Sequence, residues 1–163
     1  MLKSHHYILP LLVCLLISCR TEQVTAPPTC PACANPLLDS SAQVTISSVA
    51  DGDTFSFIER NEKIDIRILG IDTYETRHGA RLDSQAVHSG IDTASAIVLG
   101  KIAKAFADSL LRNRIVSIYR DPHQPNFDVY GRLLRHVFFT EGTLKIDYGT
   151  LMLQKKLALV DTL

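Results

Sequence analysis

The chain has 163 residues, which is room for one ordinary domain and a tail. With 46% hydrophobic and 21% charged residues and no long run of like charge, its composition is that of a globular protein without an acidic or basic tail. Because 17 Lys and Arg balance 17 Asp and Glu, the chain lacks the overall positive field of strong nonspecific nucleic-acid binders, and any such contact needs a local patch.

The first 18 residues are typical of a secretory signal. Lys3 precedes an apolar run over 8–17, which is shorter than the roughly 20 residues that span a bilayer. The run closes on Leu16-Ile17-Ser18-Cys19, which resembles a bacterial lipoprotein box. The resemblance implies lipidation of Cys19 and an exported, membrane-anchored protein that faces the periplasm or the cell exterior. The alternative is an ordinary signal peptide with a chance cysteine.

Residues 19–42 are predicted to be the lipidated cysteine and a flexible linker, because the segment is rich in Pro, Thr, Ser and Ala. Cys30 and Cys33 form a lone C-x-x-C in it. A zinc site would need a second pair of cysteines or suitably spaced histidines, and none follows. We interpret the pair as a local disulfide of an exported segment.

A domain is predicted over 43–163. Apolar and polar residues alternate over 44–49, 54–59 and 63–71, which predicts three strands of an antiparallel meander. Residues 76–90 are polar and are predicted to form a loop, with a short helix near 84–88.

The second half of the domain begins with a predicted helix over 95–112, where apolar residues recur at steps of three and four. Strands are predicted over 114–120 and 133–140, separated by a loop with two prolines. Asp147 is placed to cap a short helix that runs to about Lys155. A helix between strands three and four, and another near the C-terminus, predict a mainly β, α+β fold: a five-stranded OB-like barrel, an architecture that commonly binds oligonucleotides.

Charged residues gather beside the predicted strand ends. Asp53 and Asp72 offer the hard oxygen ligands of a cation such as Ca²⁺. Glu75 could act as a general base on water. Arg67 and Arg132 carry planar guanidinium groups that suit phosphate oxygens. A solvated strand face would explain any one of these residues alone, but it explains the set less well, because functional groups concentrate at strand ends and turns.

At these residues the sequence resembles the staphylococcal thermonuclease family. The family pattern is D-G-D-T, then I-R-L-x-G-I-D-T-P-E, a helix, and D-x-Y-G-R. Here the three motifs read D-G-D-T over 51–54, I-R-I-L-G-I-D-T-Y-E over 66–75 and D-V-Y-G-R over 128–132, within a resemblance that covers about 44–160.

The resemblance implies an OB-fold phosphodiester hydrolase, an endonuclease that cleaves DNA and RNA with Ca²⁺; the residues themselves leave endo and exo modes open. It implies that Asp53, Asp72 and the Thr73 carbonyl bind the metal, and that Glu75 is the base. It also implies that Arg67 and Arg132 stabilise the phosphate transition state and that Tyr130 lines the substrate pocket. No protein partner is implied.

Two departures from the pattern stand out. Tyr74 replaces the family's proline, so the turn from Asp72 to Glu75 loses a rigid φ. The segment after Glu75 is longer than usual and carries Arg77, His78 and Arg81, which could meet phosphates or lie in a solvated loop.

A second functional hypothesis assigns the chain to another class of protein: a noncatalytic OB-type module that binds nucleic acid or protein at the cell surface. The enzyme is favoured because all the residues of the expected catalytic set are present: Asp53, Arg67, Asp72, Glu75 and Arg132. A third hypothesis is a truncated, poorly folded remnant, and its only support is that the sequence stops where the resembled family often continues into a third helix.

Overall fold

The computed structural model describes residues 41–161, all within the second of the two units into which the chain divides, Asn35–Leu163. The predicted signal segment, the lipidation site Cys19, nearly all of the predicted linker and the Cys30–Cys33 pair lie outside the described residues. The first strand begins at Ala42, next to the predicted start of the domain at 43. Within 41–161 no helix combines the length and hydrophobicity that crossing a bilayer requires.

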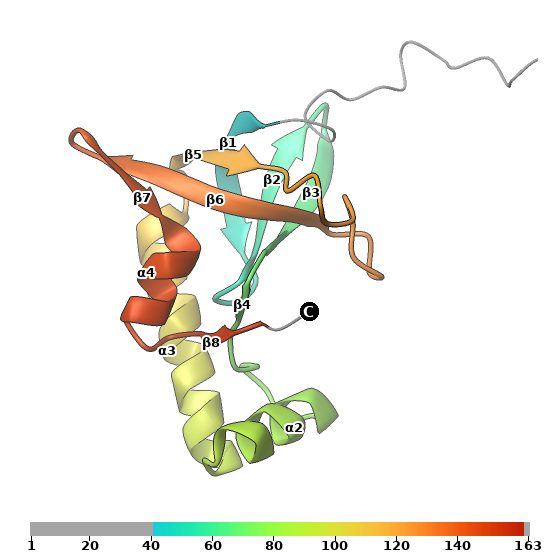
Figure 1. Cartoon of the computed structure of the whole chain (residues 1–163), viewed down its shortest axis with the longest axis vertical. Helices are drawn as coiled ribbons and strands as arrows, with labels where there is room; N and C mark the ends of the chain where they lie inside the picture. The colour runs from blue at the N-terminus through green and yellow to red at the C-terminus, as the bar shows by residue number, and fades with distance from the viewer. Residues whose placement is uncertain (1–40, 162–163) are drawn as a thin grey trace, which may run out of the picture. The chain divides into compact units, whose positions relative to one another are not determined.

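A closed five-stranded barrel forms the centre of the domain, which confirms the predicted OB-like α+β fold (Figure 1). Neighbouring strands pair antiparallel in the order β3-β2-β1-β5-β6. The barrel closes where β3 pairs parallel with β6, with Ile66 opposite Leu133. The barrel strands are β1 (Ala42–Val49), β2 (Thr54–Glu59), β3 (Glu62–Ile68), β5 (Ile115–Tyr119) and β6 (Leu133–Glu141).

Three helices and three short strands complete the described domain. β7 (Leu144–Asp147) forms a hairpin with β6, and β4 (Ile71–Asp72) pairs antiparallel with β8 (Leu159–Val160). Figure 1 shows α2 lying against the N-terminal part of α3, on the side away from the barrel. The helices are α2 (Ala80–Ser89), α3 (Thr93–Leu111) and α4 (Tyr148–Gln154).

The main core fills the barrel and extends onto α3 and α4. Alternate residues of the strands point inward, and small residues of α3 such as Ala103 and Ala107 allow that helix to pack closely. The buried ring of Tyr148 on α4 packs edge-on against Phe55 at 5.1 Å between ring centroids. A second, smaller core lies between α2 and α3 and contains Tyr74, Leu82, Ala86 and Ala96.

Several boundaries differ from the sequence prediction. The third strand was expected to reach residue 71, but β3 ends at Ile68, and Gly70 at φ +79° turns the chain into the separate strand β4. The predicted loop over 76–90 is largely the helix α2. β7 and β8 were not predicted. The predicted cap is confirmed, because the Asp147 side chain accepts a hydrogen bond from the Thr150 N–H at 3.1 Å.

Candidate functional site

The turn between β1 and β2 places Asp53 in the interior. Lys104 of α3 donates from Nζ to the carbonyls of Val49 and Ala50 at 2.7 and 2.6 Å, and the Tyr148 hydroxyl donates to the Gly52 carbonyl at 2.7 Å. Only glycine fits at 52, since a Cβ there would lie 2.7 Å from Thr73 Cγ2. The turn is therefore fixed by two helices, and Asp53 is only 1% exposed.

Arg67 of β3 stands at the centre of a group of carboxylates. Its guanidinium forms an ion pair with Asp53, donates to Asp72 Oδ1 at 2.6 Å, and lies 3.7 Å from Asp161 Oδ2. The side chain is buried, with 8% of the residue exposed. The alternative that Arg67 lies on a solvated strand face is therefore wrong, and the structure brings Asp53, Arg67 and Asp72 together as predicted from the strand ends.

The pKa values of Asp53 and Asp72 shift in opposite directions, although burial disfavours the ionised form of both. Burial raises the pKa of Asp53 to about 7, and the neighbouring Asp51 carboxylate adds to the rise while Arg67 opposes it. Burial also disfavours ionised Asp72, but hydrogen bonds from Arg67, Gln85 and Arg81 outweigh it and hold the pKa of Asp72 below its usual value. Both carboxylates contact Arg67, but only Asp72 has enough further donors to offset the effect of burial.

The segment Asp72–Glu75 connects the barrel to α2. The Thr73 N–H and hydroxyl both donate to Asp53 Oδ2, at 2.6 and 3.1 Å, and tie the segment to the turn after β1. The Glu75 carboxylate is 39% exposed and pairs with Arg81 Nε at 2.9 Å. Arg81 also donates from Nη2 to Asp72 Oδ1 at 2.7 Å, so this residue of α2 contacts both carboxylates.

Arg132, directly before β6, joins the same network through Thr54. Its Nε donates to Asp128 Oδ2 at 2.6 Å, and its Nη1 donates to the Thr54 hydroxyl at 3.2 Å, which in turn donates to Asp53 Oδ1 at 3.1 Å. Gly131 at φ +79° makes the tight turn that allows the Arg132 N–H to bond Asp128 Oδ1 at 2.9 Å. Tyr130 is 75% exposed, and its ring centroid lies 5.3 Å from Arg132 Cζ.

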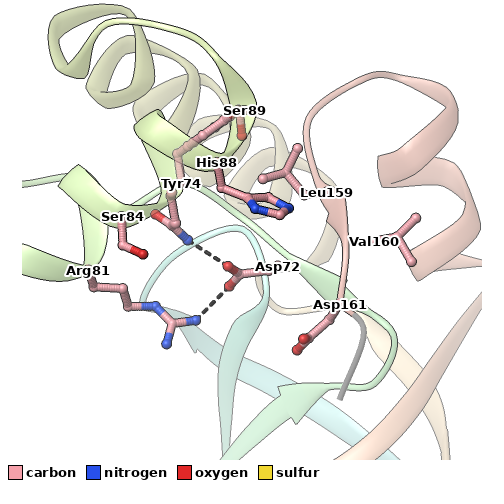
Figure 2. A pocket seen from close by; sticks show the side chains of 10 residues that line it. Asp72, Tyr74, Arg81, Ser84, His88, Ser89, Leu159, Val160 and Asp161 are labelled. Carbon is pink, nitrogen blue, oxygen red and sulfur yellow. Dashed lines mark hydrogen bonds and ion pairs between the residues drawn. The ribbon is translucent and has the colours of Figure 1, made fainter.

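Two cavities adjoin this network. One of about 420 Å³ contains Arg67, Arg132 and Tyr130, together with the apolar side chains of Phe127 and Val129. The other, of about 780 Å³, lies between α2 and β8, and Figure 2 shows Asp72 in its wall with Arg81 reaching toward it. Both cavities are lined by Arg81 and Asp161.

The donor set fits a hard cation in its chemistry. Asp53, Asp72 and the Thr73 carbonyl offer the oxygen ligands that Ca²⁺ uses. Burial and the Asp51 carboxylate raise the pKa of Asp53, and a cation bound beside it would favour its ionised form. The side chains do not form a complete set of metal ligands: within 41–161 no group of three or more His, Cys, Asp or Glu is arranged to hold a metal ion. In addition, Arg67 contacts both aspartates.

Sequence reasoning missed two residues of the site, Gln85 and Asp161. Gln85 lies in the segment expected to be a loop, although Leu82, Gln85 and Ala86 have the spacing of one buried helix face. Asp161 follows β8, and its N–H donates to the Gly70 carbonyl at 3.1 Å. Nothing local in the sequence signals that pairing, because a two-residue strand has no periodicity to detect.

The fold and the site define an OB-like barrel with a buried cluster of carboxylates and arginine at the strand ends. No family model matches the chain. Over 112 residues it is 31% identical to a protein of Methanocaldococcus jannaschii described as uncharacterized protein MJ1439; the match covers 67% of this chain and 54% of that protein. The chain therefore spans about half the length of this relative, whose description names no activity.

Proposed function

We propose that this domain is a Ca²⁺-dependent nuclease of the staphylococcal thermonuclease type, which hydrolyses phosphodiester bonds of DNA and RNA. One observation carries the proposal. Five predicted functional residues from three separate segments belong to one continuous network of hydrogen bonds and ion pairs. They are Asp53, Arg67, Asp72, Glu75 and Arg132, joined through Thr54 and Arg81.

Phosphate binding is assigned to the two arginines. Arg67 and Arg132 both line the smaller cavity, so a phosphate there meets two guanidinium groups. A planar guanidinium donates to two phosphate oxygens at once, and it stabilises the additional negative charge that develops as water attacks phosphorus. Tyr130 and Phe127 supply apolar surface in the same cavity for a nucleobase.

Glu75 is assigned the role of general base. Its carboxylate is partly exposed beside the buried network, so water reaches it, and it accepts a proton from the attacking water. Asp53, Asp72 and the Thr73 carbonyl would hold Ca²⁺, which supplies Lewis-acid stabilisation of the phosphate when bound. The ionised state of Asp72, favoured by its three hydrogen-bond donors, suits it to this task.

The test is digestion of single-stranded DNA by the purified chain without its predicted signal segment, with Ca²⁺ and with chelator. Glu75→Gln is the control for contaminating nucleases. We expect cleavage that requires both Ca²⁺ and Glu75, with DNA binding nearly unchanged in the variant. Absence of cleavage by folded wild-type protein would refute the proposal.

A second candidate function is a noncatalytic module that binds nucleic acid. The observation that favours it is the exposed aromatic and apolar surface at Phe127, Val129 and Tyr130, next to Arg132. Bases stack on such surfaces with little dependence on sequence. Binding of single-stranded DNA with no turnover at any Ca²⁺ concentration would favour this function over the nuclease.

Export and lipid anchoring at Cys19 are proposed from the sequence pattern of the first 19 residues. A palmitate analogue fed to expressing bacteria is expected to label the full chain. Cys19→Ser should abolish the label and release the protein from the membrane fraction. Equal labelling of the Cys19→Ser variant would contradict the assignment.

A further inference from the structure

We propose that Gln85 is a positioning residue, whose side-chain amide sets the places of Asp72, the Thr73 carbonyl and Glu75 relative to one another. The inference rests on the proposed function for what these three groups do. Gln85 lies on α2, and it contacts all three of them across the segment Asp72–Glu75.

Every bond of the Gln85 amide goes to this segment. Its Nε2 donates to Asp72 Oδ2 at 2.7 Å and to the Thr73 carbonyl at 2.9 Å, and its Oε1 accepts from the Glu75 N–H at 3.1 Å. The amide thus uses both of its hydrogens and its oxygen. Two of the three contacts are to proposed metal ligands, and the third is to the backbone of the proposed base.

Because Gln85 is buried, water cannot replace a hydrogen bond that its amide fails to form. Gln85 is 7% exposed and adjoins the apolar cluster of Leu82 and Ala86. A buried amide that loses its partners costs about 1–3 kcal/mol, so the segment is held where all three bonds can form. An apolar side chain would be sufficient to fill the space, and the amide therefore points to a role for its hydrogen bonds.

The segment is held by its contacts with neighbouring elements and not by a proline in its own backbone. Residue 74 is tyrosine, so no proline ring fixes φ there. Instead, α3 approaches from one side at Gly100, where a Cβ would lie 2.4 Å from the Tyr74 carbonyl oxygen. Gln85 of α2 binds the same segment through the Asp72 carboxylate, the Thr73 carbonyl and the Glu75 N–H.

The expected consequence resembles that of removing an outer partner from a metal ligand, which typically costs about 10–100-fold in metal affinity or activity. Gln85→Met keeps the length and packing of the side chain and removes its hydrogen bonds. We expect Ca²⁺ binding, measured by calorimetry without substrate, to weaken about tenfold or more. We also expect kcat on single-stranded DNA to fall more than KM rises.

Gln154→Met is the matched control, because Gln154 is exposed at the end of α4. Circular dichroism is used to confirm that each variant is folded at the assay temperature. A merely structural role for Gln85 would lower the melting temperature but leave Ca²⁺ affinity and kcat of the folded protein unchanged, and that result would overturn the proposal.

Gln85→Asn provides a second variant if Gln85→Met does not fold. It keeps the amide on an arm one methylene shorter, which cannot meet all three partners, so we expect weaker Ca²⁺ binding here too. Wild-type affinity and kcat in Gln85→Asn would overturn the proposal. Failure of the proposed function is recognised separately, because wild-type protein would then neither bind Ca²⁺ nor cleave DNA, and the role of Gln85 would fall with it.

Discussion

Burial and hydrogen-bond partners together shift the pKa values of single carboxylates in this site. Asp53 is nearly inaccessible and close to Asp51, while Asp72 receives hydrogen bonds from three donors. The two aspartates are equivalent in the sequence motifs, and only the folded surroundings separate them. We expect the difference to appear in how stability and cation binding respond to pH.

Replacement of Asp53 by Asn should stabilise the metal-free protein at pH 8. The pKa of Asp53 rises from 3.8 in the reference state to about 7 on folding. The folded protein therefore holds the extra proton between these values, and this residue makes stability fall as pH rises through that window. Asn cannot ionise, so it avoids this loss, which at about 1.4 kcal/mol per pKa unit is at most about 4 kcal/mol by pH 8. Asn also accepts fewer of the hydrogen bonds that the Asp53 carboxylate receives from Thr54 and Thr73, so we expect a net gain of about 1–3 kcal/mol.

The measurement is urea unfolding with chelator at pH 8 and pH 5, where the gain should shrink. Asp83→Asn, on the exposed face of α2, is the control. An equal gain from Asp53→Asn at both pH values would show that ionisation of Asp53 is not the cause.

Arg81 competes with a cation for the same carboxylates. It contacts Asp72 and Glu75 at 2.7 and 2.9 Å, and about half of its side chain is exposed. Arg81→Gln should therefore tighten Ca²⁺ binding about two- to fivefold, since an exposed ion pair is worth about 0.2–1 kcal/mol. Calorimetric titration checks this, with Arg77→Gln as the control from the same segment. Weaker Ca²⁺ binding in Arg81→Gln would mean that Arg81 supports the cation site.

Among the secondary-structure elements, α3 and the short strands β4 and β8 determine where the site lies. α3 supports the turn before Asp53 through Lys104 and the segment before α2 through Gly100. The pairing of β4 with β8, with Asp72 opposite Leu159, brings Asp161 to Arg67. The positions of the functional side chains are thus set largely by α3, β4 and β8, although these elements contribute few of those side chains.

Gly100→Ala should destabilise the domain, although the same change in an exposed helix normally stabilises by about 0.5–1 kcal/mol. The added Cβ would lie 2.4 Å from the Tyr74 carbonyl oxygen and 2.7 Å from that of Glu75, both backbone atoms. We expect a loss of about 1–3 kcal/mol, as for overpacking elsewhere. Thermal unfolding measures it, and Lys101→Ala, at an exposed position of α3, is the control. Unchanged stability of Gly100→Ala would contradict the close approach.

Elements with a clear period could be predicted from the sequence, and the others could not. The barrel strands alternate, α3 repeats at three and four residues, and Asp147 precedes its helix as a cap. β7 has only exposed and half-buried residues, and β4 and β8 have two residues each. Asp53, Arg67 and Asp72 were predicted to meet because strand ends meet, whereas Gln85 and Asp161 arrive through tertiary contacts of α2 and β8.

On the scale of the whole molecule, formal charge is balanced, so substrate binding depends on a few arginines. With phosphate contacts from Arg67 and Arg132, the plot of log Kobs against log salt for single-stranded DNA should have a slope of about −1 to −2, at about 0.7 per contact. Fluorescence anisotropy with the Glu75→Gln variant avoids cleavage during the measurement. Arg132→Ala should reduce the slope by about 0.7. A slope steeper than about −4 would reveal a wider basic surface.

The parallel seam that closes the barrel has a consequence for the order of events during folding. Arg67 of β3 lies opposite Leu134 of β6, two residues beyond Arg132, so the two arginines become neighbours only when segments distant in sequence meet. Contacts of this kind form slowly, because the entropy of closing a long loop must be overcome first. An incompletely folded chain therefore has no assembled phosphate site, and under the proposed function a cell that makes this protein would be spared its activity until the seam has closed.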